Sequence, residues 1–149
     1  MMYPRIFILS LCIGIISLFT ACGKKAPPSA PQNTFNVSVA NLRGEWIGEN
    51  LFLIGELRGV PKGKKAKSLI QGGRVYYGKY PMDNPPCDDC PISYQGYDDY
   101  GPEVIIDNGF SCRMTEEFKK GQITFYKVHL IGPNGSIGPP SDRVRVVEK

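Results

Sequence analysis

The chain has 149 residues, with 18 Lys and Arg against 14 Asp and Glu and a formal net charge of +4. This length suits one domain plus a short tether, and the 17 glycines and 13 prolines favour a turn-rich β fold over a helical one. Removing Arg5, Lys24 and Lys25 at the front of the chain from the 18 basic residues leaves 15 against 14 acidic ones. That balance excludes the basic footprint of a nucleic-acid-binding domain.

The first residues have the pattern of an export signal. Arg5 lies beside the amino terminus, and the stretch from Ile6 to Phe19 carries no charge. As a helix this stretch spans roughly 21 Å, which is short of a hydrocarbon core of ~30 Å. The pattern therefore predicts that residues 1–21 are a signal peptide, removed on export, and not a transmembrane helix.

The residues that follow the apolar run place two small side chains, Thr20 and Ala21, before a cysteine. The stretch from Leu18 to Cys22 resembles a bacterial lipobox, which the lipoprotein signal peptidase cuts. The resemblance implies a diacylglyceryl thioether and an acylated amine on Cys22. Because Gly23 and not Asp follows, it also implies the periplasmic face of the outer membrane, or the inner membrane where no outer membrane exists. The alternative is an ordinary secretory signal cut near Ala21.

A short stretch after the expected cleavage site carries a second resemblance. Cys22 to Pro28, reading Cys-Gly-Lys-Lys-Ala-Pro-Pro, is similar to the start of a small lipoprotein family that assists maturation of the lipopolysaccharide translocon. This resemblance implies an accessory role in lipopolysaccharide and outer-membrane assembly. From composition alone, residues 22–33 predict a proline-rich tether on the order of 35 Å long.

From residue 34 to residue 149 the pattern changes to short alternating strands separated by turns. We expect an all-β sandwich of seven strands and no helix. Gly72 and Gly73 mark a bulge or a close approach of two backbones. The expected strands are residues 35–40, 51–57, 68–80, 92–97, 104–114, 122–131 and 142–147, with a tight turn at 132–135. The strand at 104–114 is interrupted by Asp107-Asn108-Gly109. The strand at 122–131 places Ile123 and Phe125 on one face and Tyr126, Val128 and Leu130 on the other.

The last third of the chain resembles a fibronectin type III domain. The resemblance implies a fibronectin type III or immunoglobulin-like sandwich that works in binding, spacing or adhesion, and it implies no catalysis. The motifs that carry it are residues 126–130 (Tyr-Lys-Val-His-Leu), Gly135, residues 139–141 (Pro-Pro-Ser), Val144 with Val146, and residues 74–77 (Arg-Val-Tyr-Tyr).

A basic loop follows the second expected strand and carries Lys62, Lys64, Lys65 and Lys67. Alternation of strands in a sandwich places the domain's N-terminus, this loop and the final turn at one end. We therefore expect these lysines to face the membrane that holds Cys22, where each contributes about 1 kcal/mol next to anionic lipid. The alternative is a solvated loop.

Three cysteines remain once Cys12 is removed and Cys22 is lipidated. Outside the cytoplasm an odd number predicts one disulfide, and we expect a bridge from Cys87 or Cys90 to Cys112. Two alternatives stay open. Cys87-x-x-Cys90 is the spacing of a redox pair, and the three cysteines with His129 have the chemistry of a zinc site.

The middle of the chain combines acids with tyrosines. Carboxylates on one loop suit Ca²⁺, and tyrosines among acids suit a binding surface for a sugar or a protein, although a solvated turn region has the same composition. The acids are Asp83, Asp88, Asp89, Asp98, Asp99, Glu103 and Asp107, and the tyrosines are Tyr94, Tyr97 and Tyr100.

No catalytic constellation or cofactor motif accompanies these features. The sequence therefore predicts a lipid-anchored interaction or structural module in the periplasm, and not an enzyme. One alternative is an accessory factor in lipopolysaccharide and outer-membrane assembly. Another is a periplasmic thiol-active or metal-binding protein.

Overall fold

The computed structural model describes residues 35–87, 90–115 and 119–147. These residues belong to one unit, Asn33–Lys149. The expected signal peptide, the lipidation site at Cys22 and the tether all lie outside the described residues.

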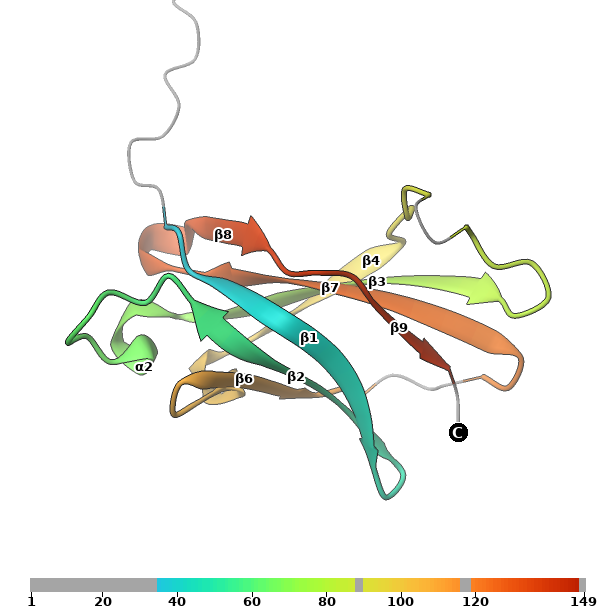
Figure 1. The fold of residues 1–149 in the computed structure, drawn as a ribbon, viewed down its shortest axis with the longest axis horizontal. Coiled ribbons are helices and arrows are strands. Elements are labelled where there is room, and N and C mark those ends of the chain that lie inside the picture. Colours follow the sequence, from blue (N-terminus) through green and yellow to red (C-terminus); the bar gives the residue numbers. More distant parts are fainter. Residues whose placement is uncertain (1–34, 88–89, 116–118, 148–149) are drawn as a thin grey trace, which may run out of the picture. The chain divides into compact units, whose positions relative to one another are not determined.

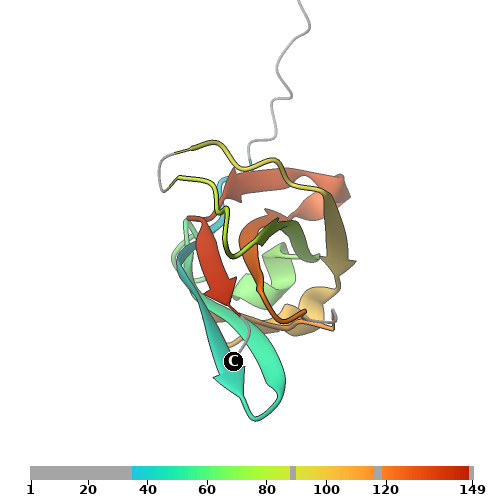
Figure 2. The same ribbon diagram turned by 90° about the vertical axis from the view of Figure 1, so that its right-hand side faces the viewer.

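The described chain forms two antiparallel sheets packed face to face, as expected for an all-β sandwich (Figures 1 and 2). The strand order matches the ABED and CFG sheets of an immunoglobulin constant-type sandwich, with β4 added at one edge. The first sheet has the order β1 (Ser38–Ile47), β2 (Asn50–Arg58), β6 (Gly109–Arg113) and β5 (Ile105–Ile106). The second has the order β4 (Gly96–Tyr100), β3 (Gly72–Pro81) and β7 (Gln122–Ile131), with β8 (Ile137–Pro140) and β9 (Val144–Val147) both paired to β7.

The described residues form nine strands, and the expected number of seven is wrong. The interruption expected at Asp107-Asn108-Gly109 is a turn in which Asp107 has a φ of 52°. The chain reverses there, so the single strand expected at 104–114 is two paired strands, β5 and β6. β8 was not expected, because Pro139 and Pro140 cannot donate to a ladder. Ser141 keeps the chain on β7 between β8 and β9: its amide donates to the Val128 carbonyl at 2.8 Å, and its Oγ accepts from the Val128 amide at 2.9 Å.

The main core fills the space between the sheets. On β7 the side chains of Tyr126, Val128 and Leu130 enter this core, whereas Ile123 and Phe125 are buried outside it. The expected division of β7 into two faces is confirmed. Cross-strand partners share a face, so this division also defines which side chains of β3 and β4 point outward.

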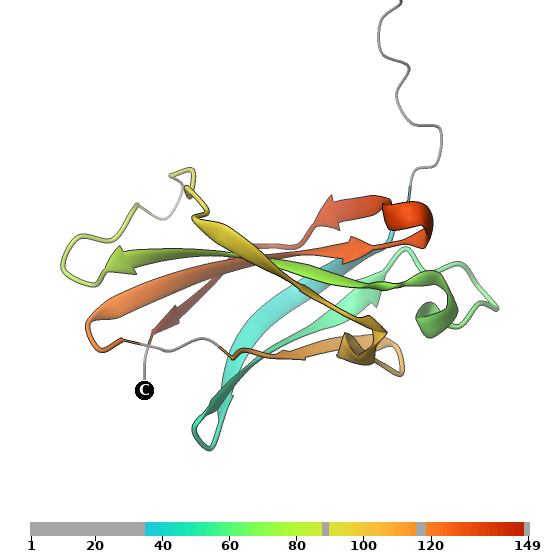
Figure 3. The ribbon, with the colours of Figure 1, turned by 180° about the vertical axis from the view of Figure 1, so that it is seen from behind.

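A short helix, α2 (Ala66–Leu69), corrects two expectations: that the third strand starts at Ser68, and that the domain has no helix. Ala66 and Ile70 are each 1% exposed and belong to the core, which favours a compact turn here over an extended edge. Pairing with β7 begins at Gln71, whose amide donates to the Ile131 carbonyl. Figure 3 shows α2 in the connection between β2 and β3.

Gly72 and Gly73 mark a close approach, the second of the two alternatives that the sequence left open. The register of β3 against β7 is continuous through both residues, so no bulge is present there. A side chain at Gly72 would collide with the Tyr100 carbonyl, and one at Gly73 would lie 3.0 Å from the Phe110 ring. Two 3₁₀ turns complete the fold, η2 (Pro102–Val104) and η3 (Pro133–Gly135); η3 lies in the turn expected at 132–135.

Candidate functional site

The cysteines do not pair as expected. Cys87 and Cys90 form a disulfide with each other, and Cys112 is a free, buried thiol. The expected bridge to Cys112 is wrong because its side chain lies in the main core, 1% exposed, on a strand of the opposite sheet. Burial raises the pKa of Cys112 to about 12. The described residues hold no cluster of three His, Cys, Asp or Glu that could bind a metal, so the zinc interpretation gains no support.

The acidic middle of the chain is dispersed over the domain. Asp99 pairs with Arg74, Glu103 accepts from the Gly101 amide at 3.0 Å, and Asp107 lies in the turn between β5 and β6. Asp88 and Asp89 lie outside the described residues. These acids therefore form no common site where the structure describes them. The tyrosines among them lie on different sides of the sheet.

Two of the three expected tyrosines lie on the outer face of the β4-β3-β7 sheet. Tyr76 of β3 is opposite both Tyr97 of β4 and Lys127 of β7, on the side away from the core. The Tyr76 ring centroid lies 5.5 Å from that of Tyr97, 6.0 Å from that of Tyr94 and 5.4 Å from that of His129. We call this surface the tyrosine face and define it as Arg74, Tyr76, Tyr94, Tyr97, Lys127 and His129.

Tyr100, the third expected tyrosine, points the other way. Its neighbours along β4 alternate, so Tyr97 is 51% exposed while Tyr100 packs against the main core. Burial, with the nearby Cys112 thiol contributing, raises the pKa of its hydroxyl. Tyr100 therefore has a structural position and does not belong to the tyrosine face.

Two cations cover the faces of these rings. The Arg74 guanidinium carbon lies 4.1 Å from the Tyr97 ring centroid. The Lys127 ammonium lies 4.6 Å from the centroid of Tyr94 and 5.9 Å from that of Tyr76. Cation–π contacts at exposed sites are each worth about 0.5–1 kcal/mol, so the cations and rings hold one another in place.

Asp99 fixes the position of Arg74. The guanidinium donates from Nε to Oδ1 at 2.7 Å and from Nη2 to Oδ2 at 2.8 Å. This two-point contact raises the pKa of Arg74 and lowers the pKa of Asp99. His129 is also fixed: its Nδ1 lies 2.9 Å from the Gly138 carbonyl. A carbonyl can only accept, so Nδ1 carries the proton of that bond.

The connection between β3 and β4, described at residues 82–87 and 90–95, is called the disulfide loop. Its residues 92–95 lie over the other half of the same outer face. The Gln95 side chain accepts from the Lys79 amide at 3.1 Å and donates to the Lys79 carbonyl at 2.8 Å. The Tyr80 hydroxyl bonds to both backbone groups of Ser93, at 3.0 and 2.9 Å. Residues 92–95 were expected to be part of an edge strand; these contacts lay them across the sheet, and β4 begins at Gly96.

An aromatic cluster that the main core does not include lies beside the disulfide loop. Phe125 is 4% exposed, with the Tyr80 ring centroid 5.8 Å away and the Arg143 guanidinium carbon 5.3 Å away. Arg143 also donates from Nη1 to the Cys90 carbonyl at 2.8 Å, which ties the bridge to this cluster. Tyr94 belongs to both the disulfide loop and the tyrosine face, so the loop sets one border of that face.

The basic loop lies at one end of the sandwich together with the turn at η3 and the first described residue (Figures 1 and 3). Side chains at Gly59 and Gly132 would collide with Asn36 and Phe35, respectively, which shows how closely these segments approach. In residues 35–87, 90–115 and 119–147 the ion pairs join Arg43 to Glu45 and Arg74 to Asp99, so the lysines of the loop form none there.

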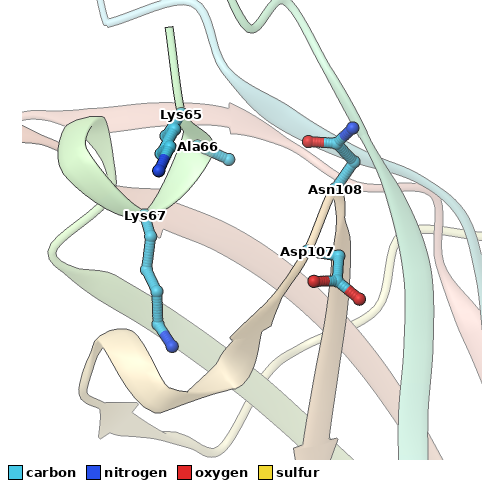
Figure 4. Close-up of a pocket in the computed structure, with 5 residues that line it drawn as sticks. All are labelled: Lys65, Ala66, Lys67, Asp107 and Asn108. Atoms are coloured by element: carbon cyan, nitrogen blue, oxygen red, sulfur yellow. The ribbon is translucent and has the colours of Figure 1, made fainter.

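A hollow of about 420 Å³ opens beside the basic loop, between α2 and the turn that joins β5 to β6. Figure 4 shows the lysines on one side and the polar turn residues on the other. Two of the four lysines that the sequence singled out therefore share a site with an acid. The lining residues are Lys65, Ala66, Lys67, Asp107 and Asn108.

Sequence reasoning missed Arg74, Tyr76 and Lys127 as members of a site. The signal that could have found them was alternation: each lies next to a buried valine, Val75 or Val128, and so points to the opposite face. Alternation alone does not show that these side chains lie together, because that depends on the pairing of β3 with β4 and with β7.

No protein-family model matches the sequence, and no similar sequence is found among curated proteins. Among the helices of the described residues, none is long and apolar enough to cross a bilayer. The functional conclusion therefore depends on the chemistry of the tyrosine face and of the basic loop.

Proposed function

We propose that this chain is a lipid-anchored module that binds a protein partner through its tyrosine face. In this proposal residues 1–21 are removed, acyl chains are attached to Cys22, and residues 34–149 are displayed in the periplasm. The lipobox resemblance of Leu18 to Cys22 supports the anchor. Several acyl chains, at about 0.8 kcal/mol per buried CH₂, suffice for stable attachment.

The observation that carries the proposed binding function is the tyrosine face itself. Tyrosine and arginine are enriched in interfaces and among the residues that dominate binding energy. The Arg74–Asp99 contact holds the guanidinium over Tyr97 before any partner arrives. Such preorganisation lowers the entropy that a partner must offset on binding.

The position of the basic loop supports an orientation. The first described residues lie close to the start of the basic loop, because Asn36 approaches Gly59, and only 12 residues separate Phe35 from Cys22. We propose that these lysines face the anionic headgroups of the outer membrane, or of the inner membrane in a cell without an outer one. The strands of the tyrosine face then lead away from the bilayer, and a partner can approach from the side.

A photo-crosslinking amino acid placed in cells at Tyr97 tests the binding function. Ile106, which is 56% exposed on the other sheet, is the matched control position. We expect a discrete crosslinked protein at position 97 and none at position 106. Translocon subunits as the crosslinked partner would support the accessory role in lipopolysaccharide assembly. Equal labelling at both positions would contradict a binding function for the tyrosine face.

The anchor is tested separately with Cys22→Ser. We expect the substituted protein to lose its acyl mass and to leave the membrane fraction or remain as uncut precursor. A Cys22→Ser protein that matures and stays with the membrane as before would contradict lipidation. Because this test does not involve the tyrosine face, either half of the proposal can fail alone.

Thiol–disulfide exchange is the second candidate function, and the Cys87–Cys90 bridge favours it. Cys87 is exposed and the spacing is that of redox pairs. In the described residues no helix begins at Cys87 to stabilise a thiolate, which makes this the weaker candidate. Reduction of insulin by the dithiol form tests it, since turnover above that of a Cys87→Ser protein would support exchange.

A further inference from the structure

We propose that the partner segment bound by the tyrosine face is acidic, with carboxylates at alternate positions of an extended strand. This inference rests on the proposed binding function and names the chemistry of the partner. Four observations on the tyrosine face carry it: the cations over the rings, the ring orientations, the balance of charge and the spacing of the two cations.

One face of Tyr97 and one face of Tyr94 already hold a cation, which reduces the aromatic surface on which a neutral ligand could stack. Arg74 covers Tyr97 at 4.1 Å, and Lys127 lies over Tyr94 at 4.6 Å. A pyranose ring binds aromatic side chains by lying against their faces, and here one face of each of these two rings is already covered by a cation. The guanidinium and the ammonium instead offer N–H donors outward, which suits an anionic acceptor.

The ring orientations add to this preference. Relative to Tyr76, the rings of Tyr94, Tyr97 and His129 are inclined by 69°, 49° and 68°. They do not form a flat platform for a sugar. Aromatic rings carry partial negative charge on their faces and partial positive charge on their edges. Because cations lie over one face of Tyr97 and one face of Tyr94, the positive edges of the inclined rings also favour a carboxylate.

The charge of the tyrosine face is unbalanced. Among the described residues, Asp99 is the one acid that the register brings to these strands on this side, and both of its oxygens are bonded to Arg74. Asp98, its neighbour, is opposite Val75 and therefore turns toward the other side of the sheet. Within the described part of this face Lys127 contacts rings and no carboxylate, so its charge can meet that of a partner.

The spacing of the two cations fits an extended segment. Arg74 is opposite His129, and Lys127 lies two residues from His129 on β7, so the two cations are diagonal neighbours. Diagonal neighbours across a strand pair are about 7–8 Å apart. Side chains on one side of a strand repeat every ~6.6–6.8 Å, so carboxylates at positions i and i+2 of a partner can reach Arg74 and Lys127 in turn.

Selection of peptides against the full-length protein in detergent tests this inference. The probe is a displayed library of random twelve-residue peptides, followed by fluorescence anisotropy on the enriched sequences. We expect enrichment of Asp and Glu at alternate positions, and binding that weakens as salt is raised. An array of neutral and acidic glycans, probed with the same preparation, tests the sugar alternative.

Three variants show whether binding occurs at the tyrosine face. Lys127→Glu should raise the dissociation constant of the enriched peptides about tenfold or more. Lys127→Met keeps the aliphatic stem over the rings and should raise it less. Lys120→Glu changes the net charge equally at an exposed turn before β7 and should leave binding unchanged. Circular dichroism checks that all three proteins fold.

Each other outcome overturns the acidic partner. Enrichment of neutral or basic peptides, binding unaffected by Lys127→Glu, or binding of glycans without peptides would each contradict it. Neutral peptides that still require Tyr97 would leave the proposed binding function intact. Absence of both a face-dependent peptide and a crosslink at position 97 would remove the binding function as well.

Discussion

The three described cysteines differ in their chemistry because their surroundings differ. Cys87 and Cys90 lie in a surface loop and bond to each other, whereas Cys112 is enclosed by the core. Burial disfavours the thiolate and raises the pKa of Cys112 to about 12 from an ordinary value of 9.0. The stability gained from keeping this thiol protonated is present below pH 9 and is lost as the pH rises toward 12.

A thiol count on the exported protein tests this assignment. Without reductant, we expect no reaction of the native protein with Ellman's reagent near neutral pH, and one thiol per chain in guanidinium chloride. The reason is that Cys112 alone is then free, if Cys12 is removed and Cys22 is acylated. A reactive native thiol would contradict the burial of Cys112, and a second thiol in denaturant would contradict lipidation.

Gly72 and Gly73 should differ in how much stability is lost when a side chain is added. We expect Gly72→Ala to lower the free energy of unfolding by about 2–3 kcal/mol, since the new Cβ meets the Tyr100 backbone carbonyl, which cannot move alone. Gly73→Ala should cost less because the Phe110 ring, 3.0 Å from where the new Cβ would lie, can shift. Urea denaturation of both variants measures the order, and an equal cost at the two positions would contradict it.

Within a single strand, alternation of apolar and polar residues predicts which side chains share a face. It divided β7 correctly and would have separated Tyr97 from Tyr100. The pairing of Cys87 with Cys90 was considered only as the redox alternative. Alternation of Phe110, Cys112 and Met114 indicates a buried Cys112, but it does not show whether Cys112 lies in the sheet that carries the bridge or in the opposite one. That distinction depends on which sheet each segment joins, which is a property of the assembled fold.

At the scale of elements, the disulfide loop couples the bridge to the tyrosine face through Tyr94. A loop this short gains only about 2 kcal/mol from cross-linking in the chain-entropy treatment. Its side-chain bonds from Gln95 and Tyr80 connect it to β3 independently of the bridge. We therefore expect the bridge to order the loop locally and to contribute little to the stability of the sandwich.

Replacing Cys87 and Cys90 together by Ser tests this coupling. Amide exchange should become faster at Ser93 and Gln95, whose amides bond to the Tyr80 hydroxyl and the Tyr77 carbonyl. The Val128 amide, bonded to Ser141 within the second sheet, is the internal control and should not change. Equal acceleration at Val128 would show that the bridge supports the whole domain.

Two elements escaped prediction for separate physical reasons. α2 is a single turn, too short to show a helical period, and the burial of Ala66 and Ile70 explains its place. β8 contains two prolines, which argue against a strand, yet its other backbone groups pair with β7 at the sheet edge. Two longer strands, β2 with its nearly continuous apolar run and β7 with its alternation, were predicted nearly to their ends.

For the whole molecule, the proposed anchor and the basic loop make a claim about orientation. The basic loop follows β2, and the turn that holds Lys119 and Lys120 precedes β7 at the opposite end of the sandwich (Figure 1). Lysines within a Debye length of an anionic surface are each attracted by about 1 kcal/mol, and distant ones are not. The two ends should therefore behave differently on a charged bilayer.

Gly63 and Gly121 offer a matched pair of labelling sites for this claim. Both have φ near 80° and open space where a side chain would go, so Gly63→Cys and Gly121→Cys should cost the same small amount of stability. Cys112 is too deeply buried to compete for the label. On lipidated protein in anionic vesicles, we expect a fluorophore at position 63 to be quenched by spin-labelled headgroups and one at position 121 not to be.

Charge, and not tether length alone, should set this difference. Replacing Lys64 and Lys65 by Ala should reduce the quenching at position 63, and so should high salt or zwitterionic lipid, because each removes the attraction that tilts the domain toward the surface. Replacing Lys119 and Lys120 by Ala removes the same charge from the far end and should change nothing. Equal quenching at positions 63 and 121, or quenching at 63 that survives loss of both lysines, would mean that the basic loop is only a solvated connection.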